Sequence, residues 1–267
     1  MNPTSSTVAS PRPARWWQRE PVRSVRRWVE PFAQPARFLR AAWELPRFMR
    51  EYRRYRKLAG DTMRPTARDL QPVFGQRGSH EIDHHYIYLN AWAARRVLAR
   101  RPAEHIDVGS QLSFTSVLSA SLPVRVVEFR PVPLNLDGIG FVEGSILALP
   151  FASGALPSVS CLHVIEHIGL ARYGDPLDPA GTIKAARELA RVLAPGGELL
   201  LGLPVGRARV CFNAHRIHDS TQVLALFPEL RLVEYSGVDD AGRFEENRPL
   251  AQLDGCEYAC GFFRFTK

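Results

Sequence analysis

Cysteine is scarce in this sequence. The 267 residues include four, which are Cys161, Cys211, Cys256 and Cys260. Four scattered cysteines do not make the disulfide framework of a small secreted protein, and no CxxC pair indicates a zinc site. Cys256 and Cys260 would share one face of a strand by parity, which favours core positions over ligand positions. We therefore expect a reduced, intracellular protein.

Long hydrophobic runs are also missing. No stretch of about 18 apolar residues predicts a transmembrane helix, and the first residues lack the apolar region of a secretory signal. A chain of 267 residues can bury one substantial core. We expect a cytoplasmic location, at the inner face of the membrane if the N-terminal segment binds lipid.

Acidic residues are scarce in the first part of the chain. Residues 1–75 contain 16 Lys and Arg against 6 Asp and Glu, which leaves 19 against 21 in the remainder. The formal charge of +8 therefore belongs to the N-terminal segment, and an anionic partner is expected there. Because no recognised nucleic-acid motif accompanies this charge, no nucleic-acid partner is expected.

The composition predicts three segments. They are a disordered tail over 1–14, a basic, Trp- and Arg-rich amphipathic helical extension over 15–75, and a globular domain over 76–267. Apolar side chains recur every three or four residues between Phe38 and Tyr55, which predicts a helix that Pro46 should kink or split. Two interpretations of this segment remain open, peripheral membrane contact through residues 15–58 or a cap packed on the core.

Strands and helices alternate over residues 105–206, which predicts an α/β fold with a mostly parallel sheet. Apolar runs bounded by turn residues predict seven strands, at 105–108, 124–128, 140–144, 159–162, 198–203, 231–237 and 256–265. Helical periodicity predicts helices at 86–101, 182–193 and 220–227. In the first of these helices, Leu89, Trp92, Ala93 and Val97 should face inward. The last two strands should form an antiparallel closing pair.

The segment VSCLHVIEHI, residues 159–168, joins a buried strand to three side chains with chemical potential. If the chain becomes helical near His163, then His163, Glu166 and His167 project from one side of the first turn. They would lie at the carboxyl end of a strand, where open α/β sheets bind their ligands.

A second group of residues follows the first predicted strand. Gly109 comes after Asp107 at a strand-to-turn junction and permits close approach of the backbone to a ligand. Glu128, at the end of the next strand, is placed to accept hydrogen bonds from the ribose hydroxyls of an adenosine cofactor. A plain turn at Gly109 is the alternative.

Taken in order, HIDVGSQLSF, VVEFRP, GSILALPF, VSCLHVIEHI and LARVLAPGGELLLGLP resemble successive motifs of class I S-adenosylmethionine-dependent methyltransferases. The resemblance implies a Rossmann-like sheet of seven strands with helices on both faces and S-adenosylmethionine as the cofactor. FNAHR at 212–216 and GLARYGDPLDPAG at 169–181 further resemble the domain of unknown function 268 group. That group implies O-methylation of a carbohydrate or lipid-linked glycan.

The resemblance also implies roles for individual residues. The cofactor-binding residues would be Asp107, Gly109, Ser110, Glu128, Ser145, Ile146 and His163. The acceptor-binding residues would be Arg172, Tyr173, Asp175, Asn213 and Arg216, unless those of the 169–181 loop only cap the following helix. The sequence departs from the pattern where Gln111 and Ser113 replace glycines, Ser145 replaces an acidic residue, and Pro157 replaces an aspartate.

HxxEH has several interpretations. It is similar to an ExxEH segment of some methyltransferases, which implies a divalent metal on His163, Glu166, His167 and His215. Without metal, His167 or His215 would be a general base, assisted by Glu166. Alternatively, Glu166 and His167 only cap a helix. A zinc peptidase is disfavoured, because the motif directly follows a buried strand and no long helix surrounds it.

The residues just before the first strand are further candidates. His84, His85, Tyr86 and Tyr88 could close over the methionine end of the cofactor, or they could be an exposed turn and core aromatics. The sequence thus predicts a methyltransferase acting on a small-molecule or glycan acceptor. The alternative is a cofactor-free scaffold that docks at a membrane surface.

Overall fold

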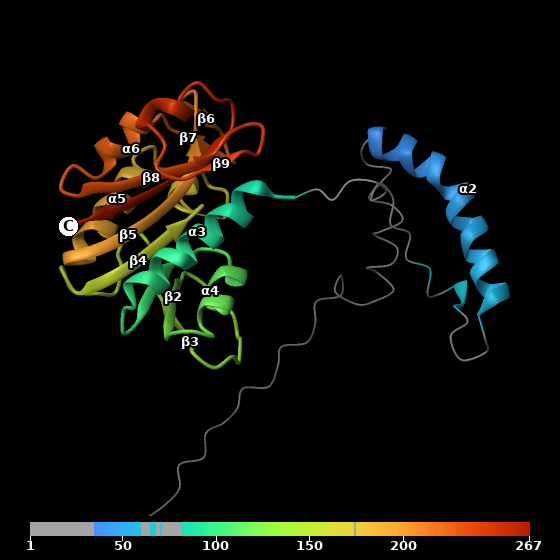
Figure 1. Ribbon diagram of the computed structural model, residues 1–267, viewed down its shortest axis with the longest axis horizontal. Helices are drawn as coiled ribbons and strands as arrows, with labels where there is room; N and C mark the ends of the chain where they lie inside the picture. Colours follow the sequence, from blue (N-terminus) through green and yellow to red (C-terminus); the bar gives the residue numbers. More distant parts are fainter. Residues whose placement is uncertain (1–34, 60–64, 68–69, 71–81, 174) are drawn as a thin grey trace, which may run out of the picture. The chain divides into compact units, whose positions relative to one another are not determined.

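The computed structural model describes residues 35–59, 65–67, 70, 82–173 and 175–267. These residues fall into two units, one up to Glu81 and one from Ile82 onward (Figure 1). The predicted tail over 1–14 lies outside the described residues. No helix in the described part of the chain has the length and apolar character needed to cross a membrane.

The described part of the N-terminal unit contains one long helix, α2 (Pro35–Leu58). Pro46 was expected to kink or split this helix, and the split is wrong, because Pro46 lies inside it and the helix continues for about three more turns. Proline removes one backbone hydrogen bond, while the neighbouring residues favour helix and Arg47 pairs with Glu51 one turn later at 2.7 Å. Its N-terminal part and its C-terminal part therefore form one element.

The second unit is built on an eight-stranded sheet with the order β3-β2-β1-β4-β5-β10-β8-β9. The strands are β1 (His105–Val108), β2 (Val124–Glu128), β3 (Ile139–Glu143), β4 (Leu156–Leu162), β5 (Leu193–Val205), β8 (Arg231–Val238), β9 (Phe244–Glu245) and β10 (Ala259–Thr266). The strands β1 to β5 run parallel, and β10 is antiparallel to both β5 and β8. The carboxyl ends of β1, β2 and β4 therefore meet at one edge.

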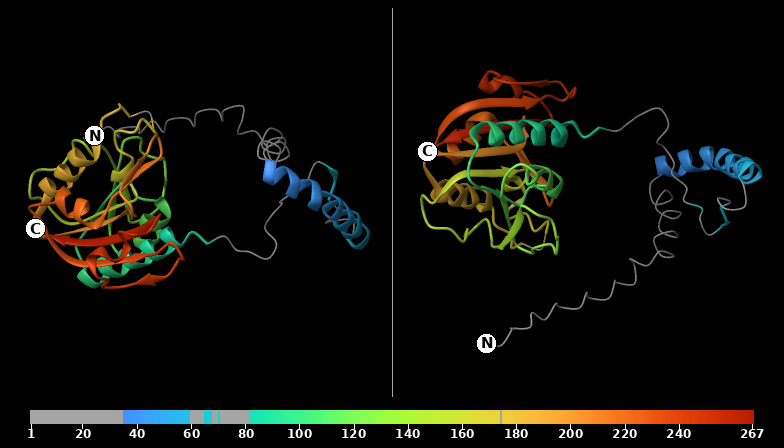
Figure 2. Two further views of the ribbon diagram at one scale, coloured as in Figure 1. Left: turned by 90° about the horizontal axis from the view of Figure 1, so that it is seen from above. Right: turned by 60° about the horizontal axis from the view of Figure 1, so that its bottom comes forward.

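Helices cover both faces of this sheet (Figure 2). One apolar core joins the sheet to α5 (Gly181–Val192) and α6 (Ser220–Leu226). A second core, on the other face, joins it to α3 (His84–Arg100) and α4 (Leu112–Leu118). A hairpin of β6 (Arg209–Cys211) and β7 (His215–Ile217) and the 3₁₀ turns Ile165–His167 and Leu250–Leu253 complete the unit.

Most predicted elements are confirmed. The buried residues of α3 are the four expected ones, Leu89, Trp92, Ala93 and Val97. The sheet has eight strands and not seven, because the two residues of β9 pair with β8. The β6–β7 hairpin was not predicted, since strands of three residues are too short to carry a hydrophobic pattern.

The expectation that Cys256 and Cys260 share one strand face is wrong. β10 begins only at Ala259, so the alternation of side chains does not extend back to Cys256. Cys256 packs against the core on the side of α5, while Cys260 is fully buried on the side of α3. All four cysteines are free thiols.

The helix α3 is fixed to the sheet by a buried carboxylate. Glu234 on β8 accepts hydrogen bonds from the indole of Trp92 at 2.7 Å and from the guanidinium of Arg96 at 2.6 and 3.0 Å. The helix also approaches β5 closely, since a Cβ at Gly202 would lie 2.4 Å from Leu89. The first turn of α3 therefore has a fixed position at the carboxyl edge of the sheet.

Candidate functional site

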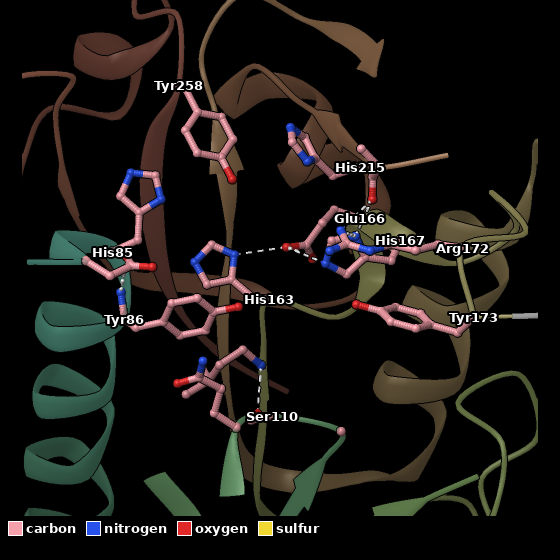
Figure 3. A pocket seen from close by; sticks show the side chains of 15 residues that line it. His85, Tyr86, Ser110, His163, Glu166, His167, Arg172, Tyr173, His215 and Tyr258 are labelled. Carbon is pink, nitrogen blue, oxygen red and sulfur yellow. Dashed lines mark hydrogen bonds and ion pairs between the residues drawn. The ribbon is translucent and has the colours of Figure 1, made fainter. Parts of the chain in front are cut away.

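A cavity of about 660 Å³ opens at the carboxyl edge of the sheet (Figure 3). Its walls come from the turn after β1, the end of β4, the 3₁₀ turn, the β6–β7 loop, the start of α3 and the residue before β10. The lining residues are Asp83, His85, Tyr86, Gly109, Ser110, Gln111, Leu162, His163, Glu166, His167, Arg172, Tyr173, Ala214, His215 and Tyr258. The three polar residues of the HxxEH motif, His163, Glu166 and His167, therefore line one cavity.

The turn after β1 is held from below by a buried polar network. The carboxylate of Asp107 accepts hydrogen bonds from the backbone N–H of Ser110 at 2.9 Å and from its hydroxyl at 2.6 Å, and the Ser160 hydroxyl donates to the same carboxylate. The Ser110 hydroxyl in turn accepts the N–H of Leu162 on β4 at 3.0 Å. Burial raises the pKa of Asp107 to about 6. Asp107 thus fixes the conformation of the turn, although its own side chain does not line the cavity.

Gly109 is the point of close approach in this turn. Its φ of +70° lies in the left-handed region, which glycine enters without strain. A Cβ there would meet Val164 at 3.3 Å. Gly109 and Ser110 line the cavity, so the predicted junction of strand, glycine turn and ligand space is present.

His163 also has a left-handed backbone, with φ of +58°, at the point where β4 ends. Its N–H still donates to Gly202 on β5 at 2.7 Å, which anchors the residue to the sheet. Its ring contacts Glu166 through Nδ1 at 2.9 Å and Cys260 Sγ through Nε2 at 3.3 Å. Burial opposes a charge on this ring, but Cys260 and Glu166 outweigh burial and raise the pKa of His163.

Glu166 is fully buried, which is unusual for a carboxylate. Its Oε1 lies 2.9 Å from His163 Nδ1 and 3.7 Å from His167 Nε2. Its Oε2 is buried without a hydrogen-bond partner in the described part of the chain. Both of its described ion-pair partners are histidines, so no Lys or Arg in the described residues neutralises it.

His167 has a defined tautomer. Its Nδ1 lies 2.6 Å from the carbonyl oxygen of Ala214 and therefore donates a proton to it. The guanidinium of Arg172 donates to the same carbonyl at 2.9 Å. Burial lowers the pKa of His167. The neutral ring thus presents an unprotonated Nε2 near Glu166, as a general base requires.

Aromatic rings form the remaining walls, as Figure 3 shows. His215 packs on Tyr258 with ring centroids 5.1 Å apart, and Tyr173 meets His167 edge to face at 5.9 Å. His85 stacks on His163 at 5.8 Å. Tyr173 is 63% exposed, so this wall faces both the cavity and solvent.

Three residues expected to bind an acceptor lie outside the cavity lining. Asp175 accepts the backbone N–H of Gly169 at 2.7 Å and shapes its own loop. Asn213 donates to the carbonyl of Leu170 at 3.2 Å. Arg216 is buried and donates to Ile168 and Thr182 at 2.7 and 3.0 Å, which ties β7 to the start of α5. These contacts hold the loop that presents Arg172 and Tyr173.

The residues expected at the adenosine end lie outside the cavity as well. Glu128 ends β2 and makes no side-chain hydrogen bond to a described residue, while Ser145 accepts the N–H of Leu147 at 3.2 Å. Ile146 is buried under the loop that follows β3. Of this set, only Glu128 presents an unused polar group beside the β1 turn.

The predicted metal site on His163, Glu166, His167 and His215 is not assembled. His163 Nε2 contacts Cys260 and its Nδ1 contacts Glu166, and the ligand atoms of His167 and His215 do not converge with those of His163. In the described part of the chain, the ligand atoms that do converge belong to His85, His163 and Cys260. Nor does Glu166 cap a helix, since it bonds His163.

Sequence reasoning did not predict Tyr258 as a lining residue, and it placed Cys260, which lies behind the cavity wall, in the core. Tyr258 directly precedes β10 and Cys260 lies within it, about a hundred residues after the central motif. Of the four residues near the start of α3, His85 and Tyr86 line the cavity, whereas His84 and Tyr88 stack on each other. Tyr258 and Cys260 lie near His163 because β10 pairs with β5, and the sequence gives no signal for that pairing.

Comparisons with known proteins identify a family over part of the chain. Residues 153–246 match the family described as "Caenorhabditis protein of unknown function, DUF268", which confirms the expected resemblance over that segment. No curated protein matches the sequence.

Solved structures resemble the fold at low identity. The cyclase SpnF is 14% identical, with a TM-score of 0.51 over 70% of this chain and 85% of its own. The N-methyltransferase NodS from Bradyrhizobium japonicum WM9, in complex with S-adenosylhomocysteine, is 17% identical over 69% and 88%, with a TM-score of 0.49. A Burkholderia thailandensis 1,6-didemethyltoxoflavin-N1-methyltransferase is 14% identical over 67% and 79%, with a TM-score of 0.48. The sheet order and the likeness to SpnF confirm the Rossmann-like fold class, and the fold alone.

Proposed function

We propose that residues 82–267 bind S-adenosylmethionine and transfer its methyl group to an oxygen of an acceptor held in the cavity. The observation that carries this proposal is the cavity itself. It lies between the Gly109 turn and His167 at the carboxyl edge of a mostly parallel sheet, where such folds bind ligands. When bound, the cofactor supplies an electrophilic methyl group on its sulfonium sulfur.

The chain has groups that fit this cofactor. Gly109 leaves the backbone open to a ligand, and Glu128 ends the neighbouring strand with a carboxylate that no described residue uses. A carboxylate there accepts hydrogen bonds from ribose hydroxyls. Gln111 and Ser110 add polar groups to the same side of the cavity. The methionine end would lie against Tyr86 and the end of β4.

His167 is the group that would receive the acceptor proton. Its Nδ1 is committed to Ala214, so Nε2 carries the lone pair. Because burial lowers the pKa of His167, the ring is neutral at physiological pH and ready to accept a proton. Arg172 fixes the same carbonyl and so keeps the imidazole in place.

The proposed acceptor is a carbohydrate or a lipid-linked glycan. The wall of the cavity supports this class of acceptor. Tyr173, His215 and Tyr258 offer apolar ring faces with polar tips, a combination that suits a molecule with both hydroxyl groups and C–H faces.

Calorimetry with S-adenosylmethionine on the full chain tests the proposal. We expect saturable binding that weakens at least tenfold in Gly109→Arg and Glu128→Ala. His167→Asn should bind normally but lose methyl transfer by about a hundredfold or more, the range for a lost general base. Glu143→Ala is the matched control, since Glu143 pairs with Glu128 in register on β3.

Two results would contradict the proposal. An absence of binding heat with the wild-type chain would leave a cofactor-free scaffold as the better interpretation. Equal affinity in Glu128→Ala and Glu143→Ala would remove Glu128 from the cofactor site.

We also propose that residues 15–58 make peripheral contact with an anionic membrane surface. The support comes from α2, where Trp43 is 85% exposed and Leu58 is 77% exposed, beside arginines such as Arg50 and Arg54. Exposed Trp and Leu together with cationic side chains are typical of helices that lie in a lipid interface. No acidic residue occupies the first turn of this helix.

A further inference from the structure

We propose that His85, His163 and Cys260 form a zinc site with one open coordination position toward the cavity. Two imidazoles and one thiol come from α3, from the end of β4 and from β10, which lie far apart in the sequence. Their ligand atoms all lie within 4.8 Å of one another. This group shares only His163 with the metal set that the sequence suggested.

The distances suit a single small ion. His163 Nε2 and Cys260 Sγ lie 3.3 Å apart. In a tetrahedral zinc site, with Zn–N of about 2.0 Å and Zn–S of about 2.3 Å, two such ligand atoms are about 3.5 Å apart. The site therefore needs no large movement of either side chain to admit the ion.

The orientation of His163 is the second observation. When the ring is neutral and its Nδ1–H donates to Glu166 at 2.9 Å, Nε2 presents its lone pair toward the thiol. Metal-binding histidines usually donate their other ring N–H to a carboxylate or carbonyl in this way. The left-handed backbone of His163 holds the ring in this position.

Glu166 supplies the third observation, which concerns charge. It is fully buried, its Oε2 has no hydrogen-bond partner among the described residues, and its described ion-pair partners are His163 and His167. A buried carboxylate is stable only when a positive charge lies nearby. A divalent ion with one thiolate and two neutral imidazoles carries a net positive charge and lies directly behind His163.

The ligand types select the ion. Thiolate with imidazole suits zinc, whereas magnesium and calcium require oxygen ligands. Three protein ligands leave one tetrahedral position free. That position faces the cavity, because His85 and His163 line it while Cys260 is buried behind them. Figure 3 shows the rings of His85 and His163 side by side at this wall of the cavity.

Metal binding to the chelator-treated full-length chain tests the site. We expect one zinc ion per chain with submicromolar affinity. Cobalt should replace it and produce a thiolate-to-cobalt charge-transfer band together with the intense visible bands of tetrahedral coordination. Cys260→Ser should abolish the charge-transfer band, and His85→Ala should weaken binding at least tenfold.

Neighbouring residues provide matched controls. Cys256→Ser removes a thiol four residues away, and His84→Ala removes the adjacent imidazole, so both should leave affinity and spectrum unchanged. Circular dichroism confirms that each variant is folded, and His85→Ala carries the test if Cys260→Ser does not fold. These readouts require no methyl transfer, so the site stands or falls independently of the proposed function.

Three outcomes would overturn the site. The first is a wild-type chain that binds neither zinc nor cobalt, which would leave a protonated His163 as the partner of Glu166. The second is an unchanged charge-transfer band in Cys260→Ser. The third is an unchanged zinc affinity in His85→Ala.

Discussion

A single backbone conformation at His163 decides where three side chains point. A non-glycine residue with positive φ costs about 1 kcal/mol or more, and at His163 two strong contacts offset it. The backbone N–H bonds Gly202 and the ring bonds Glu166. The result is that Glu166 lies between two imidazoles, one directed to Cys260 and one to the cavity. With an ordinary right-handed helical backbone at His163, the two imidazoles would project from the same side of the turn.

At the same scale, Asp107 predicts a pH-dependent stability. Burial raises the pKa of Asp107 to about 6, above the ordinary value of 3.8. The folded chain therefore holds this proton more tightly than the unfolded chain. The contribution of Asp107 to the free energy of unfolding is complete below pH 3.8 and is lost as pH rises through about 6. Relative to Asp107→Asn, the wild type should lose about 2 to 3 kcal/mol between pH 4 and pH 7.

Urea unfolding of both proteins at several pH values measures this difference. All other titrating groups are common to the two proteins, so their effects cancel in the comparison. Ser110→Ala at constant pH serves as a control for loss of a hydrogen bond without loss of the carboxyl group. Parallel stability curves for wild type and Asp107→Asn would show that Asp107 is ionised throughout, contrary to the expectation.

At the scale of elements, α3 connects the site to strand β8, which carries Glu234. Its first turn carries His85 and Tyr86, while its middle is fixed by Glu234 through Trp92 and Arg96. Because a helix transmits rigid displacement along its length, the position of His85 depends on a contact two turns away. The close packing of Leu89 on Gly202 leaves no room for a larger residue there.

Glu234→Gln is therefore expected to destabilise the chain by about 2 kcal/mol. It leaves Arg96 and the buried indole N–H of Trp92 with a poorer acceptor, and breaking a buried charged hydrogen bond costs more than a surface one. Glu246→Gln is the control, because Glu246 also pairs with Arg96, at 3.0 Å, but is 38% exposed. Its effect should stay below about 0.5 kcal/mol. Similar denaturation midpoints for the two variants would contradict the anchoring role of Glu234.

At the scale of the whole molecule, the two units carry different charge. The basic excess lies in residues 1–75, whereas the cavity belongs to residues 82–267. If the N-terminal unit contacts lipid, the full chain should co-sediment with vesicles containing anionic lipid. Binding should weaken with salt, because electrostatic attraction is screened.

Deletion of residues 1–58 should abolish sedimentation with these vesicles, and Trp43→Ala should weaken it several-fold. Ala42→Ser, which alters an adjacent exposed position of α2 without removing an aromatic ring, is the control. Vesicles of neutral lipid should bind less than anionic ones. Undiminished sedimentation of the deleted chain would place the lipid contact elsewhere.

Sequence periodicity was enough to predict the order and type of the main elements. The strand at 105–108 and the inward face of α3 are confirmed residue for residue, since both depend on local hydrophobic patterns. The cluster of His163, Glu166 and His167 at a strand end is also confirmed, because a strand's carboxyl end is defined by its own sequence. Local pattern therefore predicts the type and approximate position of each main element, but not all of its bounds, since β5 extends over Leu193–Val205.

Only the tertiary structure decided which distant residues meet. Three of the residues predicted to bind an acceptor instead make hydrogen bonds to the backbone of residues 168–170. They are Arg216, Asn213 and Asp175. Cys260 reached His163 and His85 because β10 inserts antiparallel beside β5, a pairing between strands more than fifty residues apart. Side-chain direction and long-range strand pairing depend on the packing of the whole core, and no spacing within the sequence carries that information.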